Sequence, residues 1–326
     1  MEEKILEVKN LCTTFRTERG KMRAVDGVSF HINKGEILGV VGESGCGKSV
    51  TSQSILRLYD EKRTASYEGE ILFDGKSVLA LKEKEMAKMR GSDIAMIFQD
   101  ALSSLNPVFT IGAQIMEPLR IHQHMGKEQA KKEAIEMLRL VGIPAPEKRV
   151  DQYPHELSGG MRQRAMIAIA LACHPKVLIA DEPTTALDVT IQAQIMELIK
   201  KLNNELDMGV MLITHDLAVV AETCSRVIVM YLGQIVEEGD VMELFDSPLH
   251  PYTMGLMKSI PKLEGQREDR LYMIKGMVPL LSQIPIGCRF APRCPYATER
   301  CTKEMPELRQ IKGSQKARCF KVQEER

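Results

Sequence analysis

The fold of this chain is set by the stretch Gly42-Glu43-Ser44-Gly45-Cys46-Gly47-Lys48-Ser49, which fits the pattern G-x-x-x-x-G-K-[ST]. The apolar run 36–41 before it has the composition of a buried strand, and residues 50–56 after it can open a helix. A strand, a glycine-rich turn and a helix in this order predict a loop whose backbone N–H groups surround phosphates. A glycine turn that only joins strand to helix is the alternative, and the lysine and serine in register argue against it.

Two side chains of this loop have predicted tasks. Lys48 is expected to reach the β- and γ-phosphates, and the Ser49 hydroxyl to bind Mg²⁺. The helix that follows adds partial positive charge at its N-terminus. The predicted ATP contacts in this stretch are Ser44, Gly45, Cys46, Gly47, Lys48, Ser49 and Val50.

Composition limits the classes of function. In 326 residues, Lys+Arg and Asp+Glu balance at 44 each, so net charge gives no reason to expect nucleic acid as a partner. No run of about 18 apolar residues is present, as a membrane-spanning helix would need. The first residues, Met-Glu-Glu-Lys, lack the features of a signal peptide. We therefore expect a cytoplasmic protein that reaches a membrane only through a partner.

The residues before and after the phosphate loop predict an antiparallel β layer. Alternation within 5–32 indicates two strands, and 69–75 indicates a third that ends in a hairpin turn at Asp-Gly. Phe15 lies between the first two strands, and its planar ring could stack on a purine. Taken alone, Phe15 is better explained as an aromatic residue of the core.

A predominantly helical stretch covers about 101–163. Gln99 precedes it, at the end of the apolar strand 94–100, where it could contact Mg²⁺ or the attacking water or simply be a polar strand end. The segment Lys127–Val141 carries apolar residues on one side only, which is typical of a packed amphipathic helix. We interpret 101–163 as a helical subdomain inserted into the α/β core.

Ser158-Gly159-Gly160-Met161 begins another helix and is a second candidate for binding an anion. A serine before two glycines at a helix N-terminus can hold a phosphate, and it can equally be a simple N-cap. One nucleotide seldom needs two such sites in one chain, so the two sites, if both are used, can come from two subunits.

Two further strands end in polar residues. The apolar run 176–180 is followed by Asp181 and Glu182, and adjacent strand residues point to opposite faces. Asp181 is expected to hold Mg²⁺, and Glu182 to polarise the water that attacks the γ-phosphate. His215 follows the apolar run 210–214 and could reach the γ-phosphate, although lone histidines and solvent-facing acids at strand ends are often structural. The segments 227–231 and 234–239 predict a closing hairpin.

Taken together and in this order, these motifs strongly resemble the ATP-binding cassette of ABC transporters over roughly residues 4–260. The resemblance implies a P-loop NTPase fold with a RecA-like core, an antiparallel β layer and a helical subdomain. It implies that Phe15 stacks on adenine and that Gln99, Ser158, Gly160 and His215 also contact ATP. It implies catalytic roles for Glu182, His215 and Gln99, and Mg²⁺ binding by Ser49, Gln99 and Asp181. Asp188 lies in a stretch similar to the D-loop, and Met161 stands where the family most often has glutamine.

In that family two cassettes close head to tail, so that each ATP lies between the phosphate loop of one and the signature of the other. The C-terminal part of the chain resembles a narrower group within this family. Gly287-Cys288-Arg289-Phe290-Ala291-Pro292-Arg293-Cys294-Pro295 looks like the C-terminal extension of dipeptide and oligopeptide importer ATPases of the DppD/OppD type, and His250-Pro251-Tyr252-Thr253 is similar to the place where they leave the cassette.

The extension, 261–326, contains four of the eight cysteines: Cys288, Cys294, Cys301 and Cys319. Their spacing, C-x5-C-x6-C-x17-C, lacks the tight pairs that structural zinc sites favour, and disulfides are unexpected in the cytoplasm. The spacing together with the resemblance favours a structural [4Fe–4S] cluster, with zinc or no metal as alternatives.

The resulting hypothesis is an ATP-hydrolysing subunit, a translocase, that drives import of dipeptides or oligopeptides at the cytoplasmic face of the membrane. Expected partners are a second, paralogous ATPase subunit, two transmembrane permease subunits and, indirectly, an extracytoplasmic peptide-binding protein, with no nucleic acid. Import of nickel or another solute by the same family is the alternative, and a soluble ABC ATPase without transport is a weaker one. The predicted domains are an ABC domain at 1–260 and the metal-binding extension at 261–326.

Overall fold

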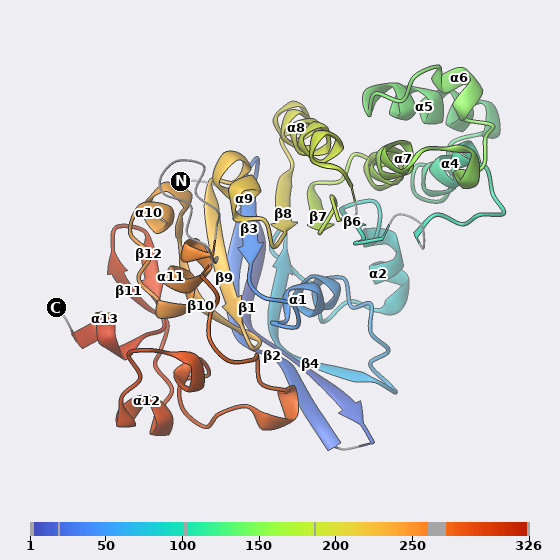
Figure 1. The fold of residues 1–326 in the computed structure, drawn as a ribbon. Helices are drawn as coiled ribbons and strands as arrows, with labels where there is room; N and C mark the ends of the chain where they lie inside the picture. Colours follow the sequence, from blue (N-terminus) through green and yellow to red (C-terminus); the bar gives the residue numbers. More distant parts are fainter. Residues whose placement is uncertain (1–2, 19, 101–103, 186, 260–271, 325–326) are drawn as a thin grey trace. The chain divides into compact units, whose positions relative to one another are not determined.

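The computed structural model describes residues 3–18, 20–100, 104–185, 187–259 and 272–324. The chain divides into two compact units, each assembled from three segments. The first unit comprises Met1–Leu6, Ile32–Ile37 and Phe73–Ile213, and the second comprises Glu7–His31, Leu38–Leu72 and Thr214–Arg326. Helices and strands of both units are labelled in Figure 1.

Three parallel strands form the centre of the first unit, in the order β8-β7-β6. They are β6 (Ile94–Ile97), β7 (Val177–Asp181) and β8 (Gly209–Ile213). Every residue of β7 and β8 is buried, which explains their nearly unbroken apolar sequence. Because parallel strands end at the same edge, the residues that follow β6 and β7 are brought together there.

Helices supply the rest of the first unit. They are α2 (Glu83–Met89), α4 (Ile111–His122), α5 (Lys127–Leu140), α6 (Pro146–Arg149), α7 (Gly159–Leu171) and α8 (Val189–Leu206), with the 3-10 turn η1 (Pro154–Glu156) and the short strand β5 (Lys76–Ser77). Figure 1 shows α4, in teal, grouped together with α5, α6 and α7, in green. The apolar side of α5 is buried at Ala130, Ala134, Met137 and Leu138, as its periodicity predicts, and α5 packs against α4 and α7. The division of the chain into an ABC domain with this subdomain and an extension stays a prediction.

One close approach in this helical group requires glycine. The Gly112 N–H, in α4, donates a hydrogen bond to the Val150 carbonyl at 2.8 Å. A Cβ atom at Gly112 would lie 2.6 Å from that carbonyl oxygen and 2.3 Å from the Val150 Cγ2. Any side chain there would push α4 away from the end of α6.

In the second unit five strands follow the order β11-β12-β10-β9-β3. They are β3 (Ile37–Val41), β9 (Arg226–Tyr231), β10 (Gln234–Asp240), β11 (Arg309–Lys312) and β12 (Gln315–Ala317). β3 is parallel to β9, and β9 and β10 form the antiparallel hairpin that the sequence predicts. β12 pairs antiparallel with β10, so the C-terminal segment extends the same sheet.

A second sheet contains neighbouring strands in the order β2-β1-β4. They are β1 (Lys4–Thr17), β2 (Gly20–Asn33) and β4 (Ala65–Phe73), all longer than the sequence predicts. The predicted turn after β4 is present. Asp74 and Gly75 have φ angles of 49° and 73°, and a two-residue hairpin turn of this kind needs both to be positive.

The helices of the second unit are short. They are α1 (Lys48–Ile55), α9 (Leu217–Thr223), α10 (Val241–Asp246), α11 (Pro251–Lys258), α12 (Glu299–Lys303) and α13 (Phe320–Glu324), with the 3-10 turns η2 (Leu281–Gln283) and η3 (Ala291–Arg293). Among the helices in the described part of the chain, none has the length and hydropathy needed to cross a bilayer.

Candidate nucleotide site and cysteine cavity

The predicted phosphate loop joins β3 to α1 within the second unit. Gly42 has a φ of 151°, and a Cβ atom there would lie 2.3 Å from the Met230 carbonyl oxygen. Gly47 is the N-cap of α1 with a φ of 101°, a conformation that side chains rarely adopt. The glycines therefore set the path of the loop, and its middle, at Ser44 and Gly45, is exposed to solvent.

Lys48 is the first residue of α1 and is only 5% exposed. Its Nζ donates hydrogen bonds to the carbonyl oxygens of Gly42, at 2.7 Å, and Glu43, at 3.2 Å. The ammonium is thus held over the loop, where it can exchange these bonds for charge-assisted bonds to phosphate oxygens. Ser49 and Val50 follow it in the first turn of α1 and are half-buried.

Cys46 has a structural place in the loop. Its side chain is fully buried, and burial raises the pKa of the thiol. Its backbone N–H donates to the Glu43 carbonyl at 3.3 Å, and its carbonyl accepts from the Gly233 N–H at 2.8 Å. The loop is therefore tied to the β9–β10 turn through Cys46.

Phe15 is half-buried rather than part of the core. Its ring meets the Tyr59 ring edge-on, with 4.8 Å between centroids and an interplanar angle of 89°. The Tyr59 N–H donates to the Tyr67 hydroxyl oxygen at 3.2 Å, and burial raises the pKa of Tyr67 to about 12. Sequence reasoning missed Tyr59, since no local pattern connects it with a ring 44 positions earlier. A partly exposed aromatic ring held in place by another ring can stack on a base.

His215 is exposed and lies in the second unit. The preceding residue, Thr214, donates its N–H to the carbonyl of Val40 at 3.3 Å, close to the start of the phosphate loop. Asp216 then caps α9, accepting from the N–H groups of Ala218 and Val219. His215 is thus fixed between a strand contact and a helix cap, beside the carboxyl end of β3.

In the first unit, the structure brings Gln99 and Glu182 together. Gln99 Nε2 donates to Glu182 Oε2 at 2.8 Å, and the Thr185 hydroxyl donates to the same oxygen at 2.9 Å. Glu182 has a φ of 47°, an unfavourable conformation for a residue with a side chain, and its N–H donates to the Ile213 carbonyl at 2.9 Å. Backbone strain of this kind often accompanies functional sites.

The two adjacent carboxylates have different surroundings. Asp181 ends β7 and is only 3% exposed, whereas Glu182 is half-buried. Glu182 lies just beyond the fully buried strand β7 and has a positive φ, so the alternation expected for two adjacent strand residues does not apply to this pair. A buried carboxylate suits a tightly held cation, and a more accessible one suits contact with water.

Ser158 is the N-cap of α7, and its hydroxyl accepts a hydrogen bond from the Met161 N–H at 3.4 Å. Ser158 and Gly159 are exposed, and a Cβ at Gly159 would meet nothing within 4 Å. The N-terminus of α7 is therefore both capped and open to solvent, so it can accept an anion from another subunit. Asp188 is likewise an N-cap, of α8, bonded to the Ile191 N–H at 2.9 Å. The neighbouring Ala186 lies outside the described residues.

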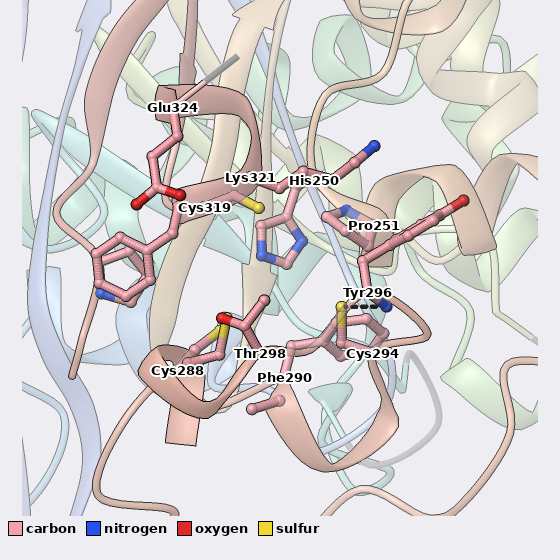
Figure 2. Close-up of a pocket in the computed structure, with 14 residues that line it drawn as sticks. His250, Pro251, Cys288, Phe290, Cys294, Tyr296, Thr298, Cys319, Lys321 and Glu324 are labelled. Carbon is pink, nitrogen blue, oxygen red and sulfur yellow. Dashed lines mark hydrogen bonds between the residues drawn. The ribbon is translucent and has the colours of Figure 1, made fainter. Parts of the chain in front are cut away.

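The four C-terminal cysteines line one cavity of about 370 Å³, together with residues such as His250, Phe290 and Tyr296. Figure 2 shows Cys288, Cys294 and Cys319 around it, and the Tyr296 N–H donates to the Cys294 sulfur at 3.4 Å. Burial raises the pKa of Cys288, to about 11, and raises the pKa of Cys294 and Cys319. No group of three or more His, Cys, Asp or Glu side chains among the described residues is arranged to hold a metal ion.

Comparison with known proteins gives two family matches. Residues 25–185 match the family described as ABC transporter, and residues 236–301 match the family described as Oligopeptide/dipeptide transporter, C-terminal region. The second match contains Cys288, Cys294 and Cys301.

Relatives are similar over nearly the whole chain. The probable peptide ABC transporter ATP-binding protein y4tR of Sinorhizobium fredii is 54% identical, over 98% of this chain and 96% of its own length. The oligopeptide transport ATP-binding protein AppD of Bacillus subtilis is 52% identical over 98% of each chain. The dipeptide transport ATP-binding protein DppD of Haemophilus influenzae is 51% identical over 97% of this chain and 94% of its own.

Solved structures resemble the chain as well. The bacterial ABC transporter cassette MJ0796, solved as a dimer, is 32% identical, with a TM-score of 0.65 over 72% of this chain and 98% of its own. A structure of MJ0796 in a post-hydrolysis state with ADP and Pi gives the same values.

Proposed function

The chain belongs to the family of ATP-binding proteins of peptide ABC transporters, and from this premise we propose that it is the ATPase subunit of an importer of dipeptides or oligopeptides. The observation that carries the proposal is the presence in one chain of both the ABC transporter match and the oligopeptide/dipeptide C-terminal match. Relatives named for peptide transport align with both parts at once.

ATP is held, in this proposal, by the phosphate loop and by Phe15. The loop N–H groups and the Lys48 ammonium neutralise the β- and γ-phosphates, while the Phe15 ring stacks on the adenine. The glycine conformations of the loop and the position of Lys48 over its carbonyls support this assignment. Mg²⁺, when bound, neutralises phosphate charge, and Ser49, Gln99 and Asp181 are the residues proposed to hold it.

Hydrolysis is assigned to Glu182, Gln99 and His215. Glu182 accepts a proton from the attacking water, since its carboxylate is accessible and oriented by two hydrogen bonds. Gln99 has both a donor and an acceptor, so it can hold Glu182 and the water together. His215 is proposed to contact the γ-phosphate. Its side chain is exposed, and the preceding residue, Thr214, is held close to the start of the phosphate loop by its hydrogen bond to the Val40 carbonyl.

The complete site needs a second cassette. The open N-terminus of α7, with Ser158 and Gly160, is proposed to bind the γ-phosphate of an ATP held by the partner cassette. The relative MJ0796 was solved as a dimer, which supports an arrangement of two cassettes. The partner is proposed to be a paralogous ATPase subunit. Two permease subunits and, indirectly, an extracytoplasmic peptide-binding protein complete the importer, with this chain at the cytoplasmic face of the membrane.

The side chains of Cys288, Cys294, Cys301 and Cys319 are not arranged around a metal ion in this structure, but we also propose that they hold a structural [4Fe–4S] cluster when it is bound, with zinc as the alternative. Four thiols from distant positions line one cavity, and thiolate is the ligand that such clusters use. Burial raises the pKa of the Cys288, Cys294 and Cys319 thiols and so favours their neutral form, and the positive charge of a bound metal is what would favour their thiolates.

Transport in cells tests the proposal. Cells that lack the chain should lose uptake of a radiolabelled dipeptide, and the wild-type chain, but not Glu182→Gln, should restore it. Loss of radioactive nickel uptake with normal dipeptide uptake would instead identify a nickel importer. If a tagged chain purified from membranes brought ribosomes and no membrane subunits with it, the transport proposal would fail.

A further inference from the structure

The C-terminal segment contacts the phosphate loop through one ion pair. Arg293 Nη1 donates to Glu43 Oε2 at 2.6 Å, and Arg293 Nη2 donates to Glu43 Oε1 at 3.0 Å. The arginine side chain is 4% exposed and the glutamate side chain 29% exposed. A two-bonded arginine–carboxylate pair that is this well buried has a fixed geometry, unlike a surface pair.

Arg293 is held by more than Glu43. Its Nε donates to the Lys275 carbonyl at 3.1 Å, and Nη2 also approaches the Ile274 carbonyl at 3.4 Å. Its guanidinium lies 5.8 Å from the centroid of the Tyr231 ring and 5.9 Å from that of Phe290. These contacts restrain the guanidinium independently of Glu43. Forming the ion pair therefore costs the arginine side chain little conformational freedom.

Glu43 in turn helps to fix the parts of the loop that hold phosphate. Its carbonyl accepts from Lys48 Nζ at 3.2 Å and from the Cys46 N–H at 3.3 Å. Its own N–H donates to the hydroxyl oxygen of buried Tyr252 at 2.7 Å. Glu43 is therefore held by its backbone on one side and by Arg293 through its carboxylate on the other.

The charge of Glu43 would otherwise oppose ATP. A free carboxylate on a loop that surrounds phosphates repels them, and the repulsion is large where water is partly excluded. Arg293 neutralises this carboxylate and restrains its direction. The same contact keeps the Glu43 carbonyl in place for Lys48.

We propose that Arg293 is a positioning residue for ATP binding: by holding Glu43, it keeps the phosphate loop in the shape and charge state that accepts the nucleotide. The segment that bears the cysteines therefore supports the nucleotide site, because Arg293 ends η3 and is followed directly by Cys294. This inference rests on the proposed ATPase function, since it assigns Arg293 a part in holding ATP.

The full-length chain with Arg293→Gln tests the inference, with Arg309→Gln as the matched control. Arg309 also forms an ion pair in the C-terminal segment, with Glu307, but both side chains are exposed. We expect Arg293→Gln to raise the Kd for a fluorescent ATP analogue and the KM for ATP about tenfold, with kcat changed less than about twofold. Arg309→Gln should leave all three unchanged.

A second substitution separates positioning from general damage. In Arg293→Gln with Glu43→Gln, the uncompensated carboxylate is gone, so ATP affinity should recover to within about threefold of wild type. Arg293→Lys, which keeps the charge but not the paired bonds, should give an intermediate Kd. If Arg293→Gln fails to fold, Arg293→Lys still decides, because a wild-type Kd for the lysine variant overturns the inference.

Failure of the inference and failure of the proposed function look different. A wild-type chain that binds no ATP analogue refutes the proposed function. A wild-type chain that binds it, with an Arg293→Gln variant of equal affinity, refutes only the role of Arg293. The role of Arg293 is also refuted if the double variant loses as much ATP affinity as the two single variants lose together.

Discussion

Gln99 and Glu182 are joined by a hydrogen bond of 2.8 Å between Nε2 and Oε2, across 83 positions of sequence. The bond links Gln99, two residues beyond the end of β6, with Glu182, directly after β7, and these two strands are parallel neighbours. The bond orients the Glu182 carboxylate, which is proposed to accept the proton of the attacking water. The Thr185 hydroxyl donates to the same carboxylate oxygen. This pair is the basis of the first prediction.

Glu182→Gln should keep ATP binding and lower hydrolysis about 10²- to 10⁴-fold, because an amide cannot accept the proton. Phosphate release and binding of a fluorescent ATP analogue measure the two effects. Glu205→Gln, on the exposed side of α8, is the control and should hydrolyse ATP normally. Near wild-type hydrolysis by Glu182→Gln would remove Glu182 from the mechanism.

Lys48→Ala should weaken nucleotide binding itself. Loss of a charge-assisted contact to the β- and γ-phosphates corresponds to an increase in Kd of roughly 10- to 100-fold. Titration with the same ATP analogue measures it, and Lys201→Ala on α8 serves as a control with an exposed side chain. An unchanged Kd would mean that Lys48 holds only its own loop.

Ser158→Arg should prevent formation of an ATP-bound dimer while leaving the ATP affinity of the single chain unchanged. A long cationic side chain would fill the open N-terminus of α7, where the partner's phosphate is expected. Size-exclusion chromatography with ATP, in the Glu182→Gln background, measures dimer formation. Exposed Ser104 provides the control variant Ser104→Arg. Equal dimer formation by both would place the partner's nucleotide elsewhere.

Cys294→Ala should abolish metal binding and reduce stability, whereas Cys173→Ala, outside the cavity, should not affect the metal. Protein purified without oxygen should show a broad visible absorption and about four irons per chain. Metal analysis measures the iron content, and an absorption spectrum measures the visible band. One zinc per chain with no visible band would replace the cluster by a zinc site.

Acid should destabilise the fold through His250. Burial lowers the pKa of His250 from 6.5 to about 3, and its Nδ1 accepts the Tyr252 N–H at 3.1 Å, so the neutral form is required. Its contribution to stability is therefore complete above pH 6.5 and is lost as the pH falls toward 3. Thermal unfolding across this pH range should show that His250→Asn loses less stability on acidification than wild type does. Exposed His174, with a φ of 51°, gives the control His174→Asn, which should follow wild type.

Local patterns predicted much of the fold. The apolar runs that became β3, β7 and β8 could be read directly, because buried parallel strands need apolar residues at nearly every position. The stripe of α5 and the turn at Asp74-Gly75 were also correct, since both depend on neighbouring residues. Each of these features is encoded within about fifteen residues.

Contacts between distant positions could not be read in this way. Tyr59 meets Phe15, Tyr252 meets Glu43 and Arg293 meets Glu43 across 44, 209 and 250 positions. None of these residues stands in a periodic pattern that indicates its partner, because the topology of the sheet decides which segments meet. The same reason applies to β12, whose three residues carry no strong strand signal but pair with β10.

The pairing of β12 with β10 has a consequence for the cassette without its tail. Glu237 and Glu238 of β10 face Ala317 and Lys316 of β12, and Gly239 allows Gln315 to approach closely. A chain ending at Ser259 would leave β10 as a bare edge strand with unpaired backbone groups, which favours self-association. By pairing with β10, the C-terminal segment should therefore also protect the cassette from aggregation. The shortened chain should precipitate under conditions in which the whole chain stays in solution.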